Sequence, residues 1–273
     1  MALKIYSLLG VLRIIATFGI FIFHFLGLMN LNNQGIDQAS IFIFCFISGY
    51  LSFTIDNQPL SWLYKRLSSI MIPYWFVIIP VVIANRIELY KETTILSDLI
   101  TIIGGNLFLN NPIYVIAWYI TFINILYLFI FFHKASKNIM LTFVIWLLGL
   151  IFFGLYLHKY LYFISFALGY FGASKKPYPS IKSIKLNCWS KSIFAVQDRS
   201  YAFFLIHGGV LIFLSEKLKM TGPSMFCLGI LISAGGAIFL HKVTKQFISK
   251  ATKKVLKKCI ESSPGKYSSG KRP

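Results

Sequence analysis

The residues best suited to chemistry are an arginine and a histidine inside the first apolar stretch of this 273-residue chain. Arg13 and His24 lie within Tyr6–Met29, where almost every other side chain is apolar. Eleven residues at about 100° each amount to about three turns plus 20°, so a helix would place both side chains on one face, about 16 Å apart along its axis. A guanidinium binds anions, and an imidazole transfers protons near neutral pH.

Two interpretations of this pair are open from the residues alone. An arginine inside a membrane helix is costly, so such residues usually face a protein interior or a wet cavity. Arg13 and His24 would then form a polar face, with a charge at one end and a proton-transfer group at the other. In the alternative, Arg13 extends its charge to one membrane surface and His24 lies at the other surface.

The element that positions this pair must be a membrane-spanning helix, because Tyr6–Met29 is long enough to cross a hydrocarbon core of about 30 Å. The whole chain is 57% hydrophobic and 13% charged, against about 25% charged residues in soluble domains. We therefore expect an all-α, polytopic bundle of about eight transmembrane helices in a cell membrane. The short apolar piece at 98–109, broken by Gly104 and Gly105, is expected to be interfacial or re-entrant.

The later apolar runs give the expected positions of the other spans. They are 39–55, 70–84, 114–132, 139–157, 160–173, 200–214 and 223–240. The division into domains follows from this pattern. We expect a membrane domain at 1–241 and a cytoplasmic tail at 242–273, in which a basic amphipathic helix that binds anionic lipid precedes a disordered end.

The net charge of +19 is distributed as in a membrane protein. Lysines and arginines lie mostly between or after the apolar runs, so we expect lipid rather than nucleic acid as the partner. With eight spans, the basic segments fall on one side, which should be the cytoplasm, together with both termini. These segments are Lys65/Arg66, Lys134/Lys137, 174–191 and the tail. The four scattered cysteines indicate neither a disulfide framework nor a metal site.

Five motifs in order carry a resemblance to a known family. They are Arg13 with His24, FISGYLSF at 46–53, YKRLSSIMIPYW at 64–75, AWYITF at 117–122 and SYAFFLIH at 200–207. With this order and spacing over about residues 8–240, the chain resembles the membrane acyltransferase-3 family of O-acyltransferases, which modify sugars and other cell-surface acceptors. It differs from the usual family pattern in having Ser69 where a second arginine often follows Arg66 by three residues, and in having fewer than about ten spans.

The resemblance implies an enzyme that moves an acyl group, such as acetyl, from cytoplasmic acyl-CoA to a hydroxyl of a cell-surface or lipid-linked glycan. It implies His24 as the catalytic residue and Arg13 as its partner, with acyl-CoA or acetyl-CoA as a donor substrate and no bound cofactor or metal. Lys65 and Arg66 are candidates for binding the donor's phosphates. In the alternative, these two are ordinary charges of a cytoplasmic segment.

Four further residues in the motifs are candidates for lining a substrate cavity: Ser48, Trp118, Tyr201 and His207. For His207, a structural hydrogen bond inside the bundle is favoured over a place in the cavity wall. A second class of function also fits the composition, namely a transporter or export partner for surface polysaccharide in which Arg13 and His24 line a pathway. That class gains from inverted repeats or paired broken helices, which the sequence does not display.

Overall fold

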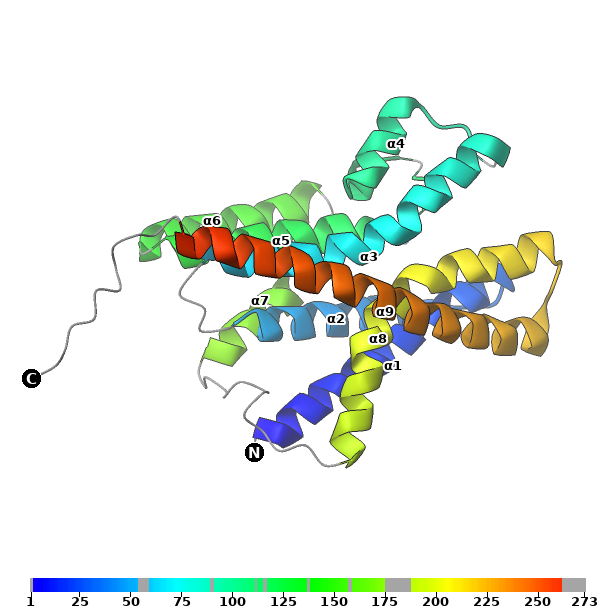
Figure 1. Ribbon diagram of the computed structural model, residues 1–273, viewed down its shortest axis with the longest axis horizontal. Coiled ribbons are helices and arrows are strands. Elements are labelled where there is room, and N and C mark those ends of the chain that lie inside the picture. The colour runs from blue at the N-terminus through cyan, green and yellow to red at the C-terminus, as the bar shows by residue number, and fades with distance from the viewer. Residues whose placement is uncertain are drawn as a thin grey trace, which may run out of the picture.

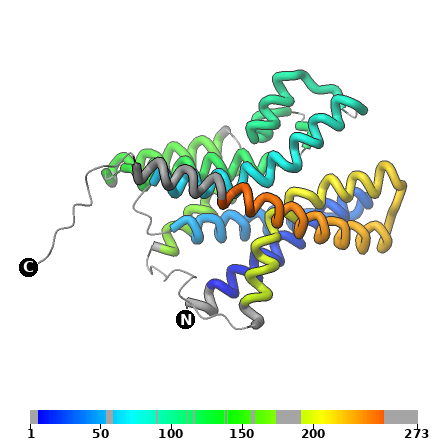
Figure 2. Tube along the Cα trace, viewed as in Figure 1, coloured from blue at the N-terminus to red at the C-terminus, as the bar shows by residue number. Residues whose placement is uncertain are grey.

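The protein is helical throughout the regular part of the chain that the structure describes (Figure 1). The computed structural model describes the backbone of residues 2–53, 59–88, 91–110, 112–114, 117–136, 138–156, 159–174 and 188–261 (Figure 2). Among these residues, the side chains of 2–5, 139, 156, 174, 188–190 and 250–261 are not described. The expected linker at 174–191 and the expected disordered end therefore lie mostly outside the described residues, as do the side chains of most of the expected amphipathic tail.

Nine α-helices occur in the described residues. They are α1 (Ala2–Leu28), α2 (Ile36–Ser52), α3 (Pro59–Glu88), α4 (Ile95–Ile102), α5 (Trp118–Ala135), α6 (Ile139–Ile151), α7 (Tyr160–Ser174), α8 (Cys188–Ile212) and α9 (Gly222–Glu261). A 3-10 turn follows α4, and single π-helical turns extend α6 and α8. The all-α prediction is confirmed.

The helices have the lengths and composition of a membrane protein. Within the described residues, four are long and apolar enough to cross a bilayer: Tyr6–Leu28, Pro59–Glu88, Trp118–Ala135 and Gly222–Ser249. Three shorter apolar helices accompany them, at Ile36–Ser52, Met140–Leu155 and Tyr160–Ala173. The chain is thus a membrane protein, and the number of eight spans stays a prediction.

Two helices begin earlier than the apolar runs predict. Helix α3 begins at Pro59 rather than near residue 70, so Lys65 and Arg66 lie on a helix rather than in a loop. The cause is an apolar face that continues back to Trp62, whose side chain is 3% exposed. Helix α8 begins at Cys188 rather than near residue 200, because Ile193 and its neighbours pack against α1 through this polar stretch.

The last helix is longer than expected. Helix α9 runs without a break through the expected domain boundary after residue 241, and it packs against both α8 and α3. In Figure 1 this helix crosses α8 and then continues alongside α3. As a result, residues just beyond 241 belong to the helical bundle.

Helices α2 and α7 form the closest pair in the bundle. A Cβ atom added at Gly49 would meet the backbone of Phe166, and one added at Gly169 would meet the backbone of Phe46. The Ser165 hydroxyl also donates to the carbonyl oxygen of Phe42 at 2.7 Å. Small residues allow such close approach of membrane helices, where van der Waals contact and interhelical hydrogen bonds drive association.

Helix α4 and the turn after it lie beside one end of α3 (Figure 1). Arg86 forms an ion pair with Asp98 at 2.5 Å, and the Trp75 indole donates to the carbonyl oxygen of Ile102 at 2.9 Å. This arrangement holds the 98–109 segment against α3 near the turn that precedes α5. Its interfacial or re-entrant position in the membrane stays a prediction.

Candidate functional site

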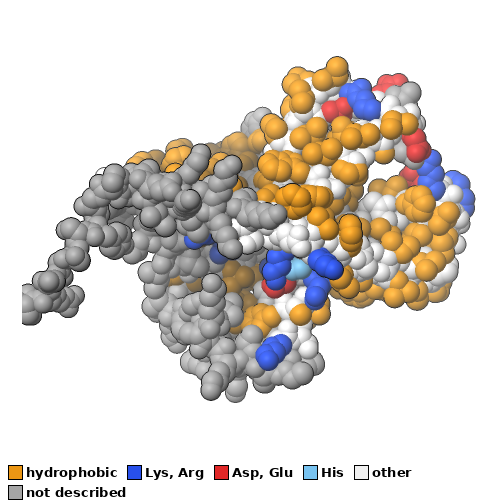
Figure 3. Space-filling model, viewed as in Figure 1, with side chains coloured by type: hydrophobic (Ala, Val, Ile, Leu, Met, Phe, Trp, Pro, Cys, Tyr) orange, Lys and Arg blue, Asp and Glu red, His pale blue; other side chains and the backbone are white. Residues whose placement is uncertain are grey.

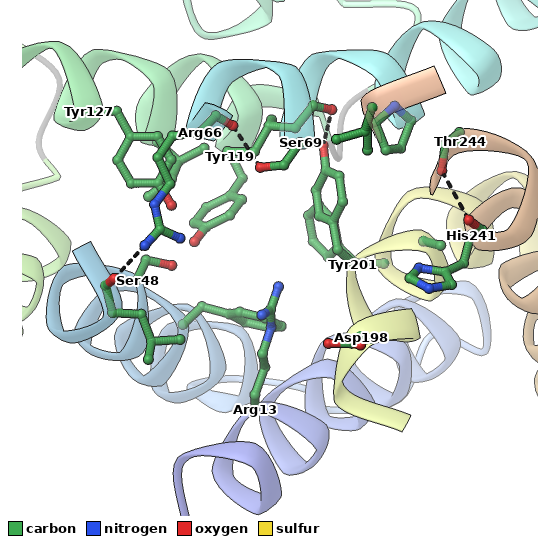
Figure 4. Close-up of a pocket in the computed structure, with 18 of the residues that line it drawn as sticks. Arg13, Ser48, Arg66, Ser69, Tyr119, Tyr127, Asp198, Tyr201, His241 and Thr244 are labelled. Carbon is green, nitrogen blue, oxygen red and sulfur yellow. Dashed lines mark hydrogen bonds between the residues drawn. The ribbon is translucent and has the colours of Figure 1, made fainter. Parts of the chain in front are cut away.

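A cavity of about 370 Å³ lies where six helices meet (Figure 4). It is lined from α1, α2, α3, α5, α8 and α9. Its polar lining residues are Arg13, Ser48, Arg66, Ser69, Tyr119, Tyr127, Asp198, Tyr201, His241, Thr244 and Lys245. Three of these are permanent cations and one is a carboxylate, so the cavity is suited to an anionic ligand.

Arg13 reaches the cavity because its helix face is turned toward the bundle. On that face Ala16 is 1% exposed and Ile20 is 4% exposed, so the face is buried. Figure 4 shows the Arg13 side chain rising from α1 into the cavity. Among the described residues its guanidinium has no hydrogen-bond or ion-pair partner, which leaves it available to a ligand.

Arg66 is held in place by its surroundings on α2 and α3. Its guanidinium donates to the backbone carbonyl of Leu51 near the end of α2, and lies 5.9 Å from the ring centre of Trp62. Ser69 lies one turn later, and its hydroxyl donates to the carbonyl oxygen of Arg66 at 2.8 Å. Ser69 therefore lines the cavity at the position where the family often has a second arginine. The neighbouring Lys65 lies outside the cavity lining.

Tyrosines from α5 and α8 form much of the remaining polar wall. Tyr119 and Tyr127 come from α5, and Tyr201 comes from α8 (Figure 4). The Tyr201 hydroxyl donates to the carbonyl oxygen of Ile70 at 2.9 Å, which joins α8 to α3 across the cavity. These phenols present a polar edge on a rigid apolar body, which suits a ligand with both polar and apolar parts.

His24 and His207 lie together, outside this cavity. Their ring centres are 5.3 Å apart, with the planes inclined by 44°. His207 is fully buried, and its Nδ1 lies 3.2 Å from the carbonyl oxygen of Phe203. Because a carbonyl oxygen only accepts, Nδ1 carries the proton and Nε2 is left as an acceptor. Among the described residues, that Nε2 has no hydrogen-bond partner.

The ring of Phe204 lies between the cavity and the histidine pair. The ring of Phe204 lies 5.6 Å from that of Tyr119 and 6.2 Å from that of Phe44, and all three residues line the cavity. The same Phe204 ring lies 5.9 Å from the imidazole of His207. Phe204 therefore lines the cavity and also contacts His207 of the histidine pair.

The structure thus divides the predicted site residues into groups. Arg13, Ser48, Arg66 and Tyr201 line one cavity. The shared face of Arg13 and His24 is directed into the bundle, but Ala16 and Ile20 lie between them, the Thr17 hydroxyl donates back to the carbonyl oxygen of Arg13, and His24 contacts His207 instead.

Trp118 lies outside the cavity lining. Its ring is 6.0 Å from that of Tyr162, and the Lys159 ammonium lies 4.7 Å from its ring centre. Trp118 is the first residue of α5, and these contacts hold its ring against the start of α7.

Among the ionisable residues of the cavity lining, the sequence reasoning missed Asp198, His241 and Lys245, as well as the phenols of Tyr119 and Tyr127. Asp198 fell between the expected linker and the expected span from residue 200, His241 just after an expected span, and Lys245 in the expected tail. The sequence does contain a signal for the residues on α9. The spacing of His241, Thr244, Lys245 and Ile248 continues one helical face beyond the end of the apolar run.

The comparisons with known proteins agree with the resemblance. No curated protein and no solved structure matches the chain. The acyltransferase-3 family model, described as an acyltransferase domain, matches residues 7–196, more than half of the chain. The matched part contains the Arg13 and His24 pair and ends before Ser200–His207. This membrane protein therefore belongs to the acyltransferase-3 family.

Proposed function

We propose that the protein is an integral membrane O-acyltransferase that transfers an acyl group, such as acetyl, from cytoplasmic acyl-CoA to a hydroxyl of a cell-surface or lipid-linked glycan. The observation that carries this proposal is the arrangement of the cationic cavity, which adjoins the His24 and His207 pair through the single ring of Phe204. The family supplies the class of reaction.

The donor binds in the cavity in this proposal. Coenzyme A carries phosphates, and Arg13 and Arg66 offer guanidinium groups that match phosphate geometry. Lys65, which precedes Arg66 on α3, adds positive charge to the same segment of the chain. If the termini are cytoplasmic, the cavity cations Arg13, Arg66 and Lys245 lie in the cytoplasmic halves of α1, α3 and α9, on the side where acyl-CoA is found.

The histidine pair provides the chemistry. His24 takes the proton from the acceptor hydroxyl as the oxygen attacks the thioester carbonyl carbon. The tetrahedral intermediate then collapses to the new ester, and the departing thiolate of coenzyme A takes the proton from the His24 imidazolium. His207 helps to hold the His24 ring in position, because it packs against that ring and is itself held by its hydrogen bond to Phe203.

Transfer in this scheme requires the Phe204 side chain to move. The thioester end of a donor held by Arg13 must pass Phe204 to reach His24. A rotation of the Phe204 side chain would connect the two compartments, because this ring contacts both of them.

The proposed function is tested by following the acyl group. Membranes that contain the protein should transfer radiolabelled acetyl from acetyl-CoA to an alkali-labile ester on glycan, and membranes without the protein should not. Surface glycans from cells with and without the protein should differ in ester-linked acyl groups. Equal acylation in both, together with altered export of polysaccharide, would instead support the transporter or export function.

A further inference from the structure

Helix α9 presents one polar face to the cavity. His241, Thr244, Lys245 and Ile248 follow each other at intervals of three, one and three residues, and all four line the cavity. Thr244 is 2% exposed, and its hydroxyl donates to the carbonyl oxygen of Leu240 at 2.8 Å within the same helix. The polar groups that α9 offers to a ligand are therefore the imidazole of His241 and the ammonium of Lys245.

The His241 imidazole lies across the cavity from Arg13, and Lys245 lines the cavity from the next turn of α9 (Figure 4). Figure 4 shows Asp198 of α8 between Arg13 and His241. In the view of Figure 3, basic, histidine and acidic side chains gather where α8 and α9 cross, on a face that is otherwise largely hydrophobic or neutral. Charged side chains thus reach the surface beside α9, and among them Lys245 is exposed and also lines the cavity.

The charge balance indicates the class of ligand. Arg13, Arg66 and Lys245 are cations, and Asp198 is the one carboxylate among the described residues that line the cavity. Among the described residues, the Lys245 ammonium, like the Arg13 guanidinium, has no hydrogen-bond or ion-pair partner. Cations directed at one cavity from opposite walls are suited to a ligand with more than one anionic group.

We propose that α9 forms the second wall of the donor site, in which Lys245 and His241 bind phosphate groups of the acyl donor opposite Arg13 and Arg66. This inference rests on the proposed function for the identity of the donor. The family match ends at residue 196, so it assigns no role to α9. The inference also gives Lys245 a place at the cavity rather than at the lipid surface expected for the basic tail.

The test measures binding rather than transfer. Full-length protein in detergent is titrated with coenzyme A by calorimetry. Lys245→Ala and His241→Ala should each weaken binding by about tenfold, as expected for the loss of one charge-assisted hydrogen bond. Lys242→Ala is the matched control. Lys242 is an exposed lysine on the same helix that does not line the cavity, so this substitution removes the same charge away from the proposed site. The Lys242→Ala variant should bind coenzyme A like the wild type.

Two further titrations separate the possible causes. Pantetheine, which lacks the phosphates, should bind equally to the wild type and to Lys245→Ala. If Lys245→Ala weakens both ligands equally, the loss is structural and the inference is wrong. Vesicles of phosphatidylglycerol should not compete with coenzyme A; full competition would assign the phosphate site to lipid and overturn the inference.

The inference and the proposed function can fail separately. If the wild type binds coenzyme A and the Lys245→Ala and Lys242→Ala variants bind it equally well, α9 has no role in the donor site while the proposed function stands. If the wild type binds no coenzyme A, the proposed donor is wrong, and the inference fails with it.

Discussion

His207 is fully buried, and only one of its two ring nitrogens has a hydrogen-bond partner among the described residues. Its ring stacks on Phe203 with centres 6.0 Å apart, and the rings of Phe21 and Phe204 lie within 6.2 Å. Its Nδ1 is satisfied within α8, whereas its Nε2 has no hydrogen-bond partner among the described residues. A side chain packed in this way stabilises the junction of α1 and α8 and limits the positions open to His24.

The first prediction concerns this packing. His207→Ala should lower the stability of the folded protein by about 2–5 kcal/mol, as large-to-small changes in a core do, and should reduce transfer less than loss of His24. His207→Asn keeps a donor near the Phe203 carbonyl and should recover part of the stability. The measurement is thermal unfolding in detergent together with transfer per folded protein. Normal stability with abolished transfer would show that His207 is catalytic rather than structural.

At the residue scale, the sequence identifies a functional candidate when a charged residue lies inside an apolar run. It does not identify functional charges that lie at the ends of such runs. Arg13 could be found because a charge within Tyr6–Leu28 needs an explanation. Asp198 and Lys245 could not, because charges at the ends of apolar runs are ordinary in membrane proteins. Only the packing of α8 and α9 shows that these two line the same cavity as Arg13.

At the element scale, the close contact of α2 and α7 positions one wall of the cavity. Ser48 and Phe44 of α2 line the cavity, while Gly49 meets the backbone of α7. A displacement of α2 away from α7 would therefore move Ser48 and the carbonyl of Leu51 that accepts from Arg66.

The second prediction follows from this contact. Gly49→Ala and Gly169→Ala should each destabilise the protein by about 1–3 kcal/mol, because the new methyl group meets backbone atoms that cannot rotate away. Gly172→Ala on α7 is the matched control, since a Cβ there has nothing within 4 Å. It should leave the unfolding temperature equal or slightly higher, because alanine favours a helix over glycine. Equal stability of all three variants would mean that α2 and α7 are not in close contact.

The sequence predicts the existence of most of these elements better than their ends. Apolar runs locate the centres of α1, α2, α5 and α7 because the membrane requires them. The predicted starts of α3 and α8 lie after the observed ones. The first turns of these helices are amphipathic and are stabilised by packing against other helices, which the position of an apolar run does not indicate.

At the scale of the whole molecule, the orientation in the membrane decides which substrates can reach the site. The distribution of lysine and arginine predicts both termini in the cytoplasm. That orientation would open the Arg13 cavity toward the cytoplasm and place His24 in the outer half of the membrane, nearer to a surface glycan.

The third prediction tests this orientation. In a background without native cysteines, Gln34→Cys in the exposed turn between α1 and α2 should react with an impermeant maleimide added to intact cells. Lys254→Cys should react only after the membrane is permeabilised. Labelling of Lys254→Cys in intact cells would reverse the orientation and place the cationic cavity on the outer side, away from cytoplasmic acyl-CoA.

The central claim is that His24 transfers the proton during acyl transfer, and it is tested most directly by replacing that one side chain. His24→Ala should lower transfer of acetyl from acetyl-CoA by about 10²–10⁴-fold, the usual contribution of a general base. His24→Gln, which is similar in size but does not exchange protons near neutral pH, should lose as much. The assay uses membranes normalised for folded protein, so that insertion and abundance do not enter the comparison. If either variant keeps more than about a tenth of the wild-type rate, the loss is smaller than a base contributes and His24 is not the proton-transfer residue.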